Sequence, residues 1–364
     1  MIDVFWHDAA LEHDTGSGHF ELDPSDLLDV QELHPENAER IRNMRSVLQR
    51  GPIADRLRWH DGRLATEDEL RTVHDDEHIA RVRAFATGAG GRLDANTVLH
   101  AWEPVLAAAG TTLAATDAVL AGDSQTAYAL VRPPGHHAQP HQPDGYCLFN
   151  NAALAAERAR RAGRRRVAIV DWDVHHGNGN QACFYERGDV LTISLHMRTG
   201  LWGPSHPQTG SPEELGVGDG QGRNVNVELP LGSGDRAYAA AMTEIVQPIL
   251  RQFEPSLIIG SCGQDASAFD PNGRQNVSMD GFRAIGRAIG DSARELCEGQ
   301  LVLVQEGGYA RTYAAFCLHA TLEGVLGVDE PLLQETLAYI PDDFGRARDA
   351  IESVQSALSR HWRF

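Results

Sequence analysis

Lysine is absent from this chain, so all 32 of its basic side chains are arginines. They stand against 51 acidic residues, and the formal net charge is −19. Nucleic acid is therefore not an expected partner, because phosphate binding requires basic patches. The all-arginine usage is typical of a GC-rich genome, while the acid excess would attract a cationic substrate by long-range steering.

Cysteine is scarce and scattered. The chain has 5 cysteines, an odd number, and none of them forms a C-x-x-C pair. This pattern argues against a disulfide scaffold and against a zinc site built from thiolates. We interpret the thiols as buried structural side chains: Cys147, Cys183, Cys262, Cys297 and Cys317.

Long hydrophobic runs are missing as well. The most apolar long stretch, VLAAAGTTLAATDAVLAG at 105–122, is interrupted by threonines and an aspartate, which predicts that it does not span a membrane. The first residues, MIDVFWHDAA, include an early acid and no basic segment before an apolar run, so no signal peptide is expected. These features predict a cytoplasmic protein with no membrane partner.

The residues that are present indicate a large α/β fold. The chain has 364 residues, of which 42% are hydrophobic, an ordinary globular balance. Near-continuous apolar runs are typical of strands buried on both faces of a parallel sheet. Such runs occur at 127–133, 165–173, 190–196, 255–261 and 300–308. Alternating with helical stretches, they predict a doubly wound sheet.

Helices are expected between and before these runs. Amphipathic stretches lie at 150–163, 235–253 and 279–297. The N-terminal third is expected to be mostly helical, with a capping box of Thr66 and Glu69 before a helix and a further helix at 102–121.

Two segments, 8–33 and 198–224, are rich in glycine, proline and acids and predict long loops. Loops of this length are more often functional rims than linkers. We expect them to form a lid, or a contact in a homodimer or tetramer. A helical tail at about 330–364 would close a single domain of residues 1–364.

The segment DWDVHHGNG at 171–179 is the strongest chemical signal. Asp171, Asp173 and His175 are each two residues apart, and such side chains face the same side of a strand. Carboxylates and an imidazole there can converge on one cation. With no thiolate, the set suits a hydrolytic zinc with an open position, or iron(II) in the same cage.

Three more polar clusters follow predicted strands. They contain Asp265 in SCGQDAS, the pair His136 and His137 in RPPGHHA, and Tyr309 in VQEGGY. In open parallel sheets the ligand site lies beyond the carboxyl ends of the strands. We therefore expect the four clusters to build one site.

At this point the chain resembles the histone deacetylases and their bacterial relatives, the histone-deacetylase-like amidohydrolases and acetylpolyamine amidohydrolases. The resemblance rests on RPPGHHA, GYCLFNNAALAA, VDWDVHHGNGNQ, LTISLH, SCGQDAS and VQEGGY, with earlier blocks HPENAERI, VHDDEHIARV and GGRLDANT. It covers nearly the whole chain, in order. It implies one deacetylase-type catalytic domain with an arginase-like fold and an eight-stranded, mainly parallel sheet.

The resemblance also implies roles for individual residues. The zinc ligands would be Asp173, His175 and Asp265, and Asp171 would orient His136. A structural potassium ion would be held by Asp171 and the main chain around it, namely Asp173, His175, Ser194 and Leu195. A second potassium would be held by the backbone of Phe184, Arg187 and Val190. His176 is not a ligand in this scheme and faces away.

The implied chemistry is amide hydrolysis by a metal-activated water. His137 would act as general base and later as general acid, while His136 supports the developing charge. Tyr309, beyond what we take to be a flexible Gly-Gly, would donate its hydroxyl to the oxyanion.

Several residues depart from the commonest pattern of the family. Asn178 stands where some members place an aspartate, as in the class II branch, and should make His137 less basic. Gln264 replaces a common phenylalanine. The expected substrate-binding residues are Gly145 and Tyr146, which resemble the acetylpolyamine enzymes, together with Asp94, Trp202 and Asn272.

The leading hypothesis is a zinc-dependent amidohydrolase that removes acyl groups, commonly acetyl, from amines. An acetylpolyamine or other small amide, an acyl-lysine protein and a xenobiotic amide all remain open as substrates. Two alternatives are a ureohydrolase of the same fold and a catalytically silent, metal-stabilised binding module.

Overall fold

The computed structural model describes all residues except 17–24, 94–96, 199–207, 338–339 and 343. Its centre is an eight-stranded sheet in the order β2-β1-β5-β10-β9-β6-β7-β8, and every neighbouring pair is parallel. The strands are β1 Ile2–Trp6, β2 Leu57–Asp61, β5 Thr126–Ala129, β6 Val167–Asp171, β7 Val190–Met197, β8 Asn224–Leu229, β9 Leu257–Cys262 and β10 Leu301–Gln305. A separate antiparallel pair joins β3 Gly91–Arg92 to β4 Val98–Leu99. The α/β prediction is confirmed.

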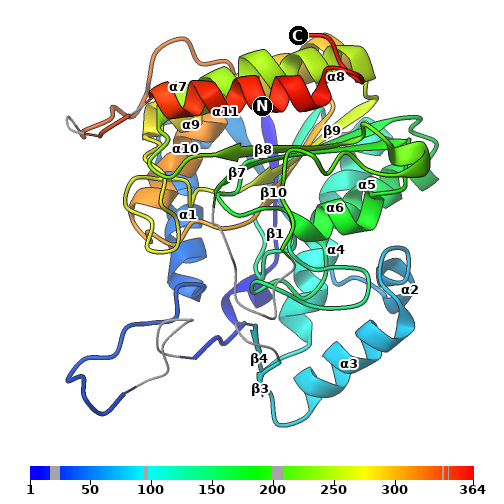
Figure 1. The fold of residues 1–364 in the computed structure, drawn as a ribbon. Helices are drawn as coiled ribbons and strands as arrows, with labels where there is room; N and C mark the ends of the chain where they lie inside the picture. Colours follow the sequence, from blue (N-terminus) through cyan, green and yellow to red (C-terminus); the bar gives the residue numbers. More distant parts are fainter. Residues whose placement is uncertain (17–24, 94–96, 199–207, 338–339, 343) are drawn as a thin grey trace.

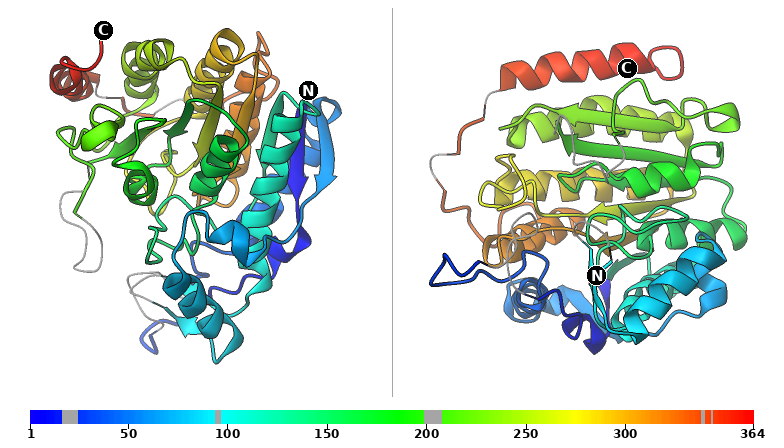
Figure 2. Two further views of the ribbon diagram at one scale, coloured as in Figure 1. Left: turned by 90° about the vertical axis from the view of Figure 1, so that its right-hand side faces the viewer. Right: turned by 60° about the horizontal axis from the view of Figure 1, so that its bottom comes forward.

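Helices cover both faces of this sheet (Figures 1 and 2). They are α1 Ala38–Arg50, α2 Glu67–Leu70, α3 Asp76–Thr87, α4 Glu103–Ala121, α5 Asn151–Arg161, α6 Asn178–Phe184, α7 Asp235–Ala241, α8 Gln247–Phe253, α9 Met279–Leu296, α10 Tyr313–Val325 and α11 Phe344–Leu358. A π-helical turn, Met242–Val246, joins α7 to α8. Short 3-10 turns lie at Asp8–Leu11, Ala54–Arg56 and Gly218–Gly220.

The packing of the inner strands explains why their sequences are continuously apolar. In β10, Leu301 and Leu303 pack into the core cluster that includes α1 and α9, whereas Val302 and Val304 pack into the cluster that includes α4 and α5. Successive strand side chains point to opposite faces, so a strand covered by helices on both sides must be apolar at every position.

Three strands of the eight-stranded sheet were not predicted. β1 and β2 lie in the third of the chain that was expected to be mostly helical, and β8 begins at the last residue of the predicted 198–224 loop. The prediction was wrong there because these strands are not continuous apolar runs: β1, IDVFW, contains Asp3, and β8, NVNVEL, alternates polar and apolar residues. β2, at one edge of the sheet, carries the charged and partly exposed residues of LRWHD.

The helix predicted after Thr66 is interrupted. Thr66 and Glu69 do form a reciprocal capping box, but α2 ends at Leu70. Asp75 then caps a separate helix, α3, by accepting the His78 N–H. In the tail, the structure assigns a helix to Phe344–Leu358.

Helix α4 is long and apolar enough to cross a membrane by length and composition alone, with a mean hydropathy of 1.4. The sequence argument that it is too polar was therefore wrong, since its many small apolar residues outweigh its threonines. In the fold, 67% of its most apolar window is buried inside the protein.

The five thiols are free; Cys183 is partly exposed and the others are buried. The interpretation as structural side chains agrees with this placement for the four buried cysteines.

Candidate functional site

The four polar clusters follow strands that are neighbours in the sheet. In the order β5-β10-β9-β6, these strands lead to His136 and His137, to Tyr309, to Asp265 and to Asp173. Because the strands are parallel, their carboxyl ends lie at one edge of the sheet. The structure therefore brings the predicted clusters together.

Asp173, His175 and Asp265 form a compact set of donor atoms, all within 4.8 Å of one another. His175 Nδ1 lies 3.1 Å from Asp173 Oδ1 and 3.1 Å from Asp265 Oδ2. Backbone N–H groups hold the carboxylates: Val174 donates to Asp265 at 2.9 Å and Gly307 donates to Asp173 at 2.8 Å. β6 ends at Asp171 and residues 173–175 form a bend, so the prediction that strand alternation carries these side chains to one face was wrong. The loop after the strand brings Asp173 and His175 together.

The charges of this set fit a bound cation. Burial alone would lower the pKa of His175, but hydrogen bonds to Asp173 and Asp265 raise it to about 10. Burial, followed by the charge of Asp173, raises the pKa of Asp265 to about 7. Without a metal, the protonated His175 therefore supplies the positive charge between the two carboxylates, and a bound cation would take over that role with a neutral imidazole as ligand. Two oxygens and one imidazole nitrogen are suitable ligands for zinc.

A second group, His136, Cys147 and Glu306, also has donor atoms within 4.8 Å of one another. Its His136 is already engaged, because Nδ1 lies 3.0 Å from Asp171 Oδ2 and Nε2 lies 3.6 Å from Asp173 Oδ1. Burial disfavours the imidazolium, yet the charges of Asp173 and Asp171 raise the pKa of His136 well above its usual value. The predicted Asp171–His136 contact is present.

His137 lies beside His136, with ring centroids 4.0 Å apart. Its Nδ1 is 2.5 Å from Asn178 Oδ1. The predicted tunnel residue Gly145 lies against its ring: a Cβ atom there would be 2.3 Å from His137 Cδ2, and Gly145 has a φ of +49°. Only glycine satisfies both constraints.

Tyr309 follows two glycines that are required by geometry. A Cβ on Gly307 would lie 2.3 Å from Asp265 Oδ2, and Gly308 has a φ of +120°. These constraints account for both glycines, and the flexibility of the Gly-Gly link stays a prediction. Burial, and then the charge of Asp173, raises the pKa of Tyr309 well above its usual value, so the phenol is a neutral hydrogen-bond donor.

Tyr146, which was predicted to line a substrate tunnel, lies beside two other aromatic rings. Its ring lies 5.8 Å from that of Tyr309 and 5.0 Å from that of His34, both edge-on. Asn272 Nδ2 donates to the Tyr146 hydroxyl at 3.3 Å, which brings two predicted substrate-binding residues together. The other two, Asp94 and Trp202, lie outside the described residues.

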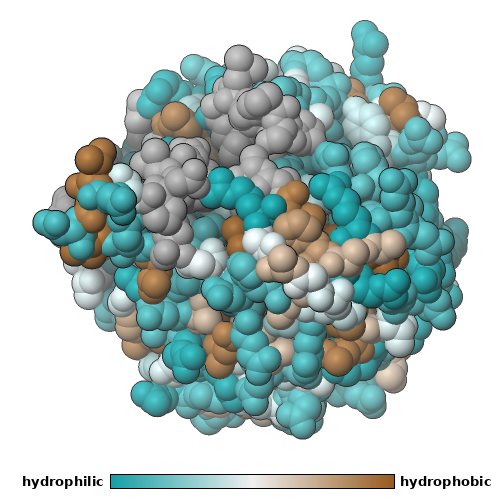
Figure 3. Space-filling view, turned by 90° about the horizontal axis from the view of Figure 1, so that it is seen from below, coloured by the Kyte–Doolittle hydropathy of each residue, from teal (hydrophilic) through white to brown (hydrophobic). Residues whose placement is uncertain are grey.

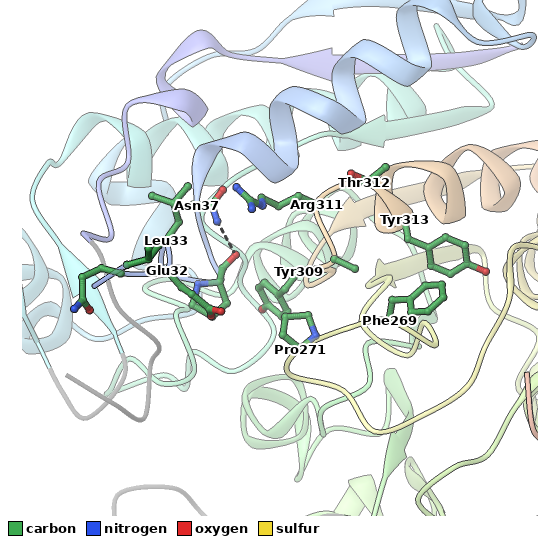
Figure 4. Close-up of a pocket in the computed structure, with 13 residues that line it drawn as sticks. Glu32, Leu33, Asn37, Phe269, Pro271, Tyr309, Arg311, Thr312 and Tyr313 are labelled. Atoms are coloured by element: carbon green, nitrogen blue, oxygen red, sulfur yellow. Dashed lines mark hydrogen bonds between the residues drawn. The ribbon is translucent and has the colours of Figure 1, made fainter. Parts of the chain in front are cut away.

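An open pocket of about 750 Å³ adjoins Tyr309. One wall is the segment before α1, with Glu32 and Leu33, and the opposite wall contains Phe269 and Pro271 (Figure 4). The face of the molecule seen from below is mostly hydrophilic, with apolar side chains in small groups (Figure 3).

His176 is buried and turned away from the proposed ligands, as predicted. Its Nε2 lies 3.1 Å from Asn226 Oδ1 and 3.2 Å from Gln181 Oε1, and its ring packs on His196 at 4.7 Å. His176 therefore belongs to a buried polar network that includes Asn226 of β8.

The residues expected around potassium fall in two places. Asp171 and Ser194 are register partners on β6 and β7, and Leu195 follows Ser194. Phe184 ends α6 and its carbonyl accepts the Arg187 N–H at 2.9 Å, close to the start of β7 at Val190.

Sequence reasoning missed residues that support the site. Asp270 Oδ2 accepts the Tyr309 N–H, and Glu306 Oε2 accepts the Gly135 N–H at 2.7 Å. Arg40 Nε donates to the Gly308 carbonyl at 2.8 Å, and Asp144 accepts from Asn178. No spacing signal distinguishes such contacts, because they join backbone groups or residues far apart in the chain.

The profile of the histone deacetylase domain matches residues 34–325 of the chain. The chain belongs to the histone deacetylase family. Histone deacetylase 8 of Arabidopsis thaliana is 51% identical over 361 residues, which cover 98% of this chain and 96% of that relative. The histone deacetylase-like amidohydrolase of Pseudomonas aeruginosa is 42% identical over 298 residues, 81% of this chain and 77% of the relative.

A solved structure agrees with this membership. The crystal structure of the HDA15 HD domain matches with a TM-score of 0.84 and 31% identity, covering 99% of this chain and 95% of that one. As a member of the histone deacetylase family, the chain is an enzyme of the deacetylase and amidohydrolase class. This finding removes the ureohydrolase alternative.

Proposed function

We propose that this histone deacetylase family member is a zinc-dependent amidohydrolase that hydrolyses N-acylated amines. The observation that carries the proposal is the convergence of Asp173, His175 and Asp265 at the edge of the sheet where His137 and Tyr309 also lie. Metal donors, a base and a hydroxyl donor are the parts that amide hydrolysis requires.

Asp173, His175 and Asp265 would hold zinc, or iron(II) in the same cage. When bound, such a metal polarises the amide carbonyl and lowers the pKa of a water from 15.7 to about 7. Potassium is proposed at the Asp171–Ser194 and Phe184–Val190 sites because the resemblance to the family implies it there.

The side chains around the metal would handle protons and charge. His137 accepts the proton of the attacking water at Nε2 as the new C–O bond forms. It then delivers that proton to the amine as the C–N bond breaks. His136, held by Asp171, stabilises the negative charge, and the Tyr309 hydroxyl donates to the carbonyl oxygen as charge develops there.

The substrate is proposed to be an acyl group on a narrow chain, either a small amine or acyl-lysine. Tyr146 and Tyr309 supply aromatic edges, and the neutral Asn272 beside Tyr146 offers no charge for a second ammonium group. The net charge of −19 favours a cationic substrate through steering.

A kinetic panel tests the proposal. The zinc-loaded enzyme would be assayed with acetylputrescine, acetylspermidine, an acetyl-lysine peptide and a trifluoroacetyl-lysine peptide. A hundredfold preference corresponds to about 2.7 kcal/mol of differential transition-state binding and decides the substrate class. Stoichiometric zinc without turnover of any of these amides would contradict the proposed substrate class.

A further inference from the structure

Asn178 contacts two side chains at opposite ends of its amide. Its Oδ1 lies 2.5 Å from His137 Nδ1, and its Nδ2 donates to Asp144 Oδ2 at 3.0 Å. All three residues are buried, with Asn178 3% and Asp144 6% exposed. The contacts therefore form one continuous path from the imidazole through the amide to a carboxylate.

The chemistry of the partners determines which way the amide points. A carboxylate oxygen at hydrogen-bond distance selects the NH₂ end of Asn178, and the His137 carbonyl, which accepts from the same Nδ2 at 3.4 Å, favours the same orientation through a longer contact. This orientation leaves Oδ1, an acceptor, facing His137 Nδ1. That nitrogen must then carry the hydrogen, so Nε2 carries none and can accept a proton, which is the tautomer a general base needs.

Asp144 is itself fixed by its turn. Its N–H donates to the Cys147 carbonyl at 3.1 Å, and the Cys147 N–H donates back at 2.7 Å. The two residues between them are Gly145, whose backbone packs on the His137 ring, and Tyr146, which has a φ of +71°. One tight turn thus supplies both Gly145, which packs on the His137 ring, and Asp144, which accepts from the Asn178 amide.

We propose that Asp144 is a positioning residue that sets the amide orientation of Asn178 and, through it, the tautomer of His137. This inference rests on the proposed function, in which His137 is the general base. It also accounts for Asn178 at a position where other family members carry an aspartate. In this chain the carboxylate belongs to Asp144, which is linked to the His137 imidazole through the Asn178 amide.

The test compares Asp144→Ala and Asp144→Asn in the zinc-loaded, full-length enzyme. We expect Asp144→Ala to lower kcat on the order of tenfold to a hundredfold, with KM changed less, because binding does not depend on the tautomer. Asp144→Asn keeps one acceptor oxygen and should recover most of the lost kcat. Asp68→Ala, at an exposed residue whose side chain is 91% accessible, is the matched control.

A second measurement reports the tautomer directly. NMR spectra that correlate ring nitrogens with ring protons should show His137 with hydrogen on Nδ1 in the parent enzyme and in Asp144→Asn. In Asp144→Ala a second tautomer should appear. A purely structural role of Asp144 would change stability without changing the tautomer.

The outcomes separate this inference from the proposed function. Unchanged kcat and an unchanged tautomer in Asp144→Ala overturn the role of Asp144, even when His137→Ala is inactive. Normal activity in His137→Ala would instead overturn the proposed function. Equal losses in Asp144→Ala and Asp144→Asn, with one tautomer throughout, would also contradict the inference.

Discussion

The carboxylate of Asp270 holds the backbone of Tyr309. Its Oδ2 accepts the N–H of Tyr309 at 2.6 Å and that of Ala310 at 3.2 Å, while Oδ1 accepts the N–H groups of Asn272 and Gly273 at 2.9 and 3.2 Å. One buried side chain therefore ties the segment carrying the proposed oxyanion donor to the segment carrying Asn272.

Replacing the Asp270 carboxylate should impair catalysis more than substrate binding. In Asp270→Asn the amide NH₂ faces backbone donors it cannot accept from, so the Tyr309 segment should loosen. We expect kcat to fall on the order of tenfold to a hundredfold, with a smaller change in KM. Steady-state kinetics on the best amide of the panel measure this. Full kcat together with an unchanged melting temperature would contradict the clamp.

Tyr309→Phe removes only the hydroxyl group, which is the proposed oxyanion donor, and keeps the aromatic ring. One such donor is worth about 3 kcal/mol, so turnover should fall by about two orders of magnitude. Zinc content, measured by atomic absorption, should stay equal to that of the parent enzyme. Near-normal activity would rule out this role for Tyr309.

Gly145→Ala tests the contact between the tight turn and His137. A Cβ would lie 2.3 Å from His137 Cδ2, so the ring must move, and kcat should fall on the order of a hundredfold. Gly163→Ala is the matched control, because Gly163 also has a positive φ, +93°, but open space where the Cβ would lie. Both variants share the backbone strain, and only Gly145→Ala should lose activity.

Metal removal should affect both activity and stability. Chelation should abolish turnover, and stoichiometric zinc should restore it. Because the metal binds only the folded chain, zinc at a hundred times its Kd should stabilise the fold by about 2.7 kcal/mol, measured as a rise in melting temperature. Asp265→Asn should lose most of that rise. A melting temperature insensitive to zinc in the parent enzyme would argue against the site.

Lowering the pH should reduce the free energy of unfolding at pH values that are still well above the usual pKa of carboxylates. Burial, aided by His78, lowers the pKa of His74 to about 3, and its Nε2 accepts the Asn150 N–H, so it is neutral in the folded chain. Below about pH 6.5 the unfolded chain binds a proton that the folded chain does not. The free energy of unfolding should therefore fall by up to about 1.4 kcal/mol per pH unit from this group, until the pH approaches 3.

Denaturant titrations at pH 7, 6 and 5 check this effect. His74→Gln should reduce the pH slope of the free energy of unfolding by about one proton relative to the parent chain. An identical slope in the parent chain and in His74→Gln would contradict the assignment. Other buried histidines act with the same sign: His13, His78 and His196, whose burial lowers the pKa to about 3, 4 and 4.

Much of the fold could be predicted because the inner strands are covered on both faces. Burial on both sides requires apolar residues throughout, and this leaves runs such as VAIVD in β6 that a reader of the sequence can find. The edge strand β2 faces solvent and pairs on one side, so its residues carry no such pattern. The hydropathy of α4 was misjudged because its many small apolar residues outweigh its threonines and its aspartate.

The amino-acid sequence by itself determined the chemistry: carboxylates, imidazoles and a tyrosine placed after apolar strands. Tertiary structure alone decided that β5, β10, β9 and β6 are neighbours, so that these groups meet. It also decided the supporting contacts, Asp270 with Tyr309 and Asp144 with Asn178. The physical reason is that strand order and hydrogen bonds between distant segments depend on packing, which leaves no local periodicity in the chain.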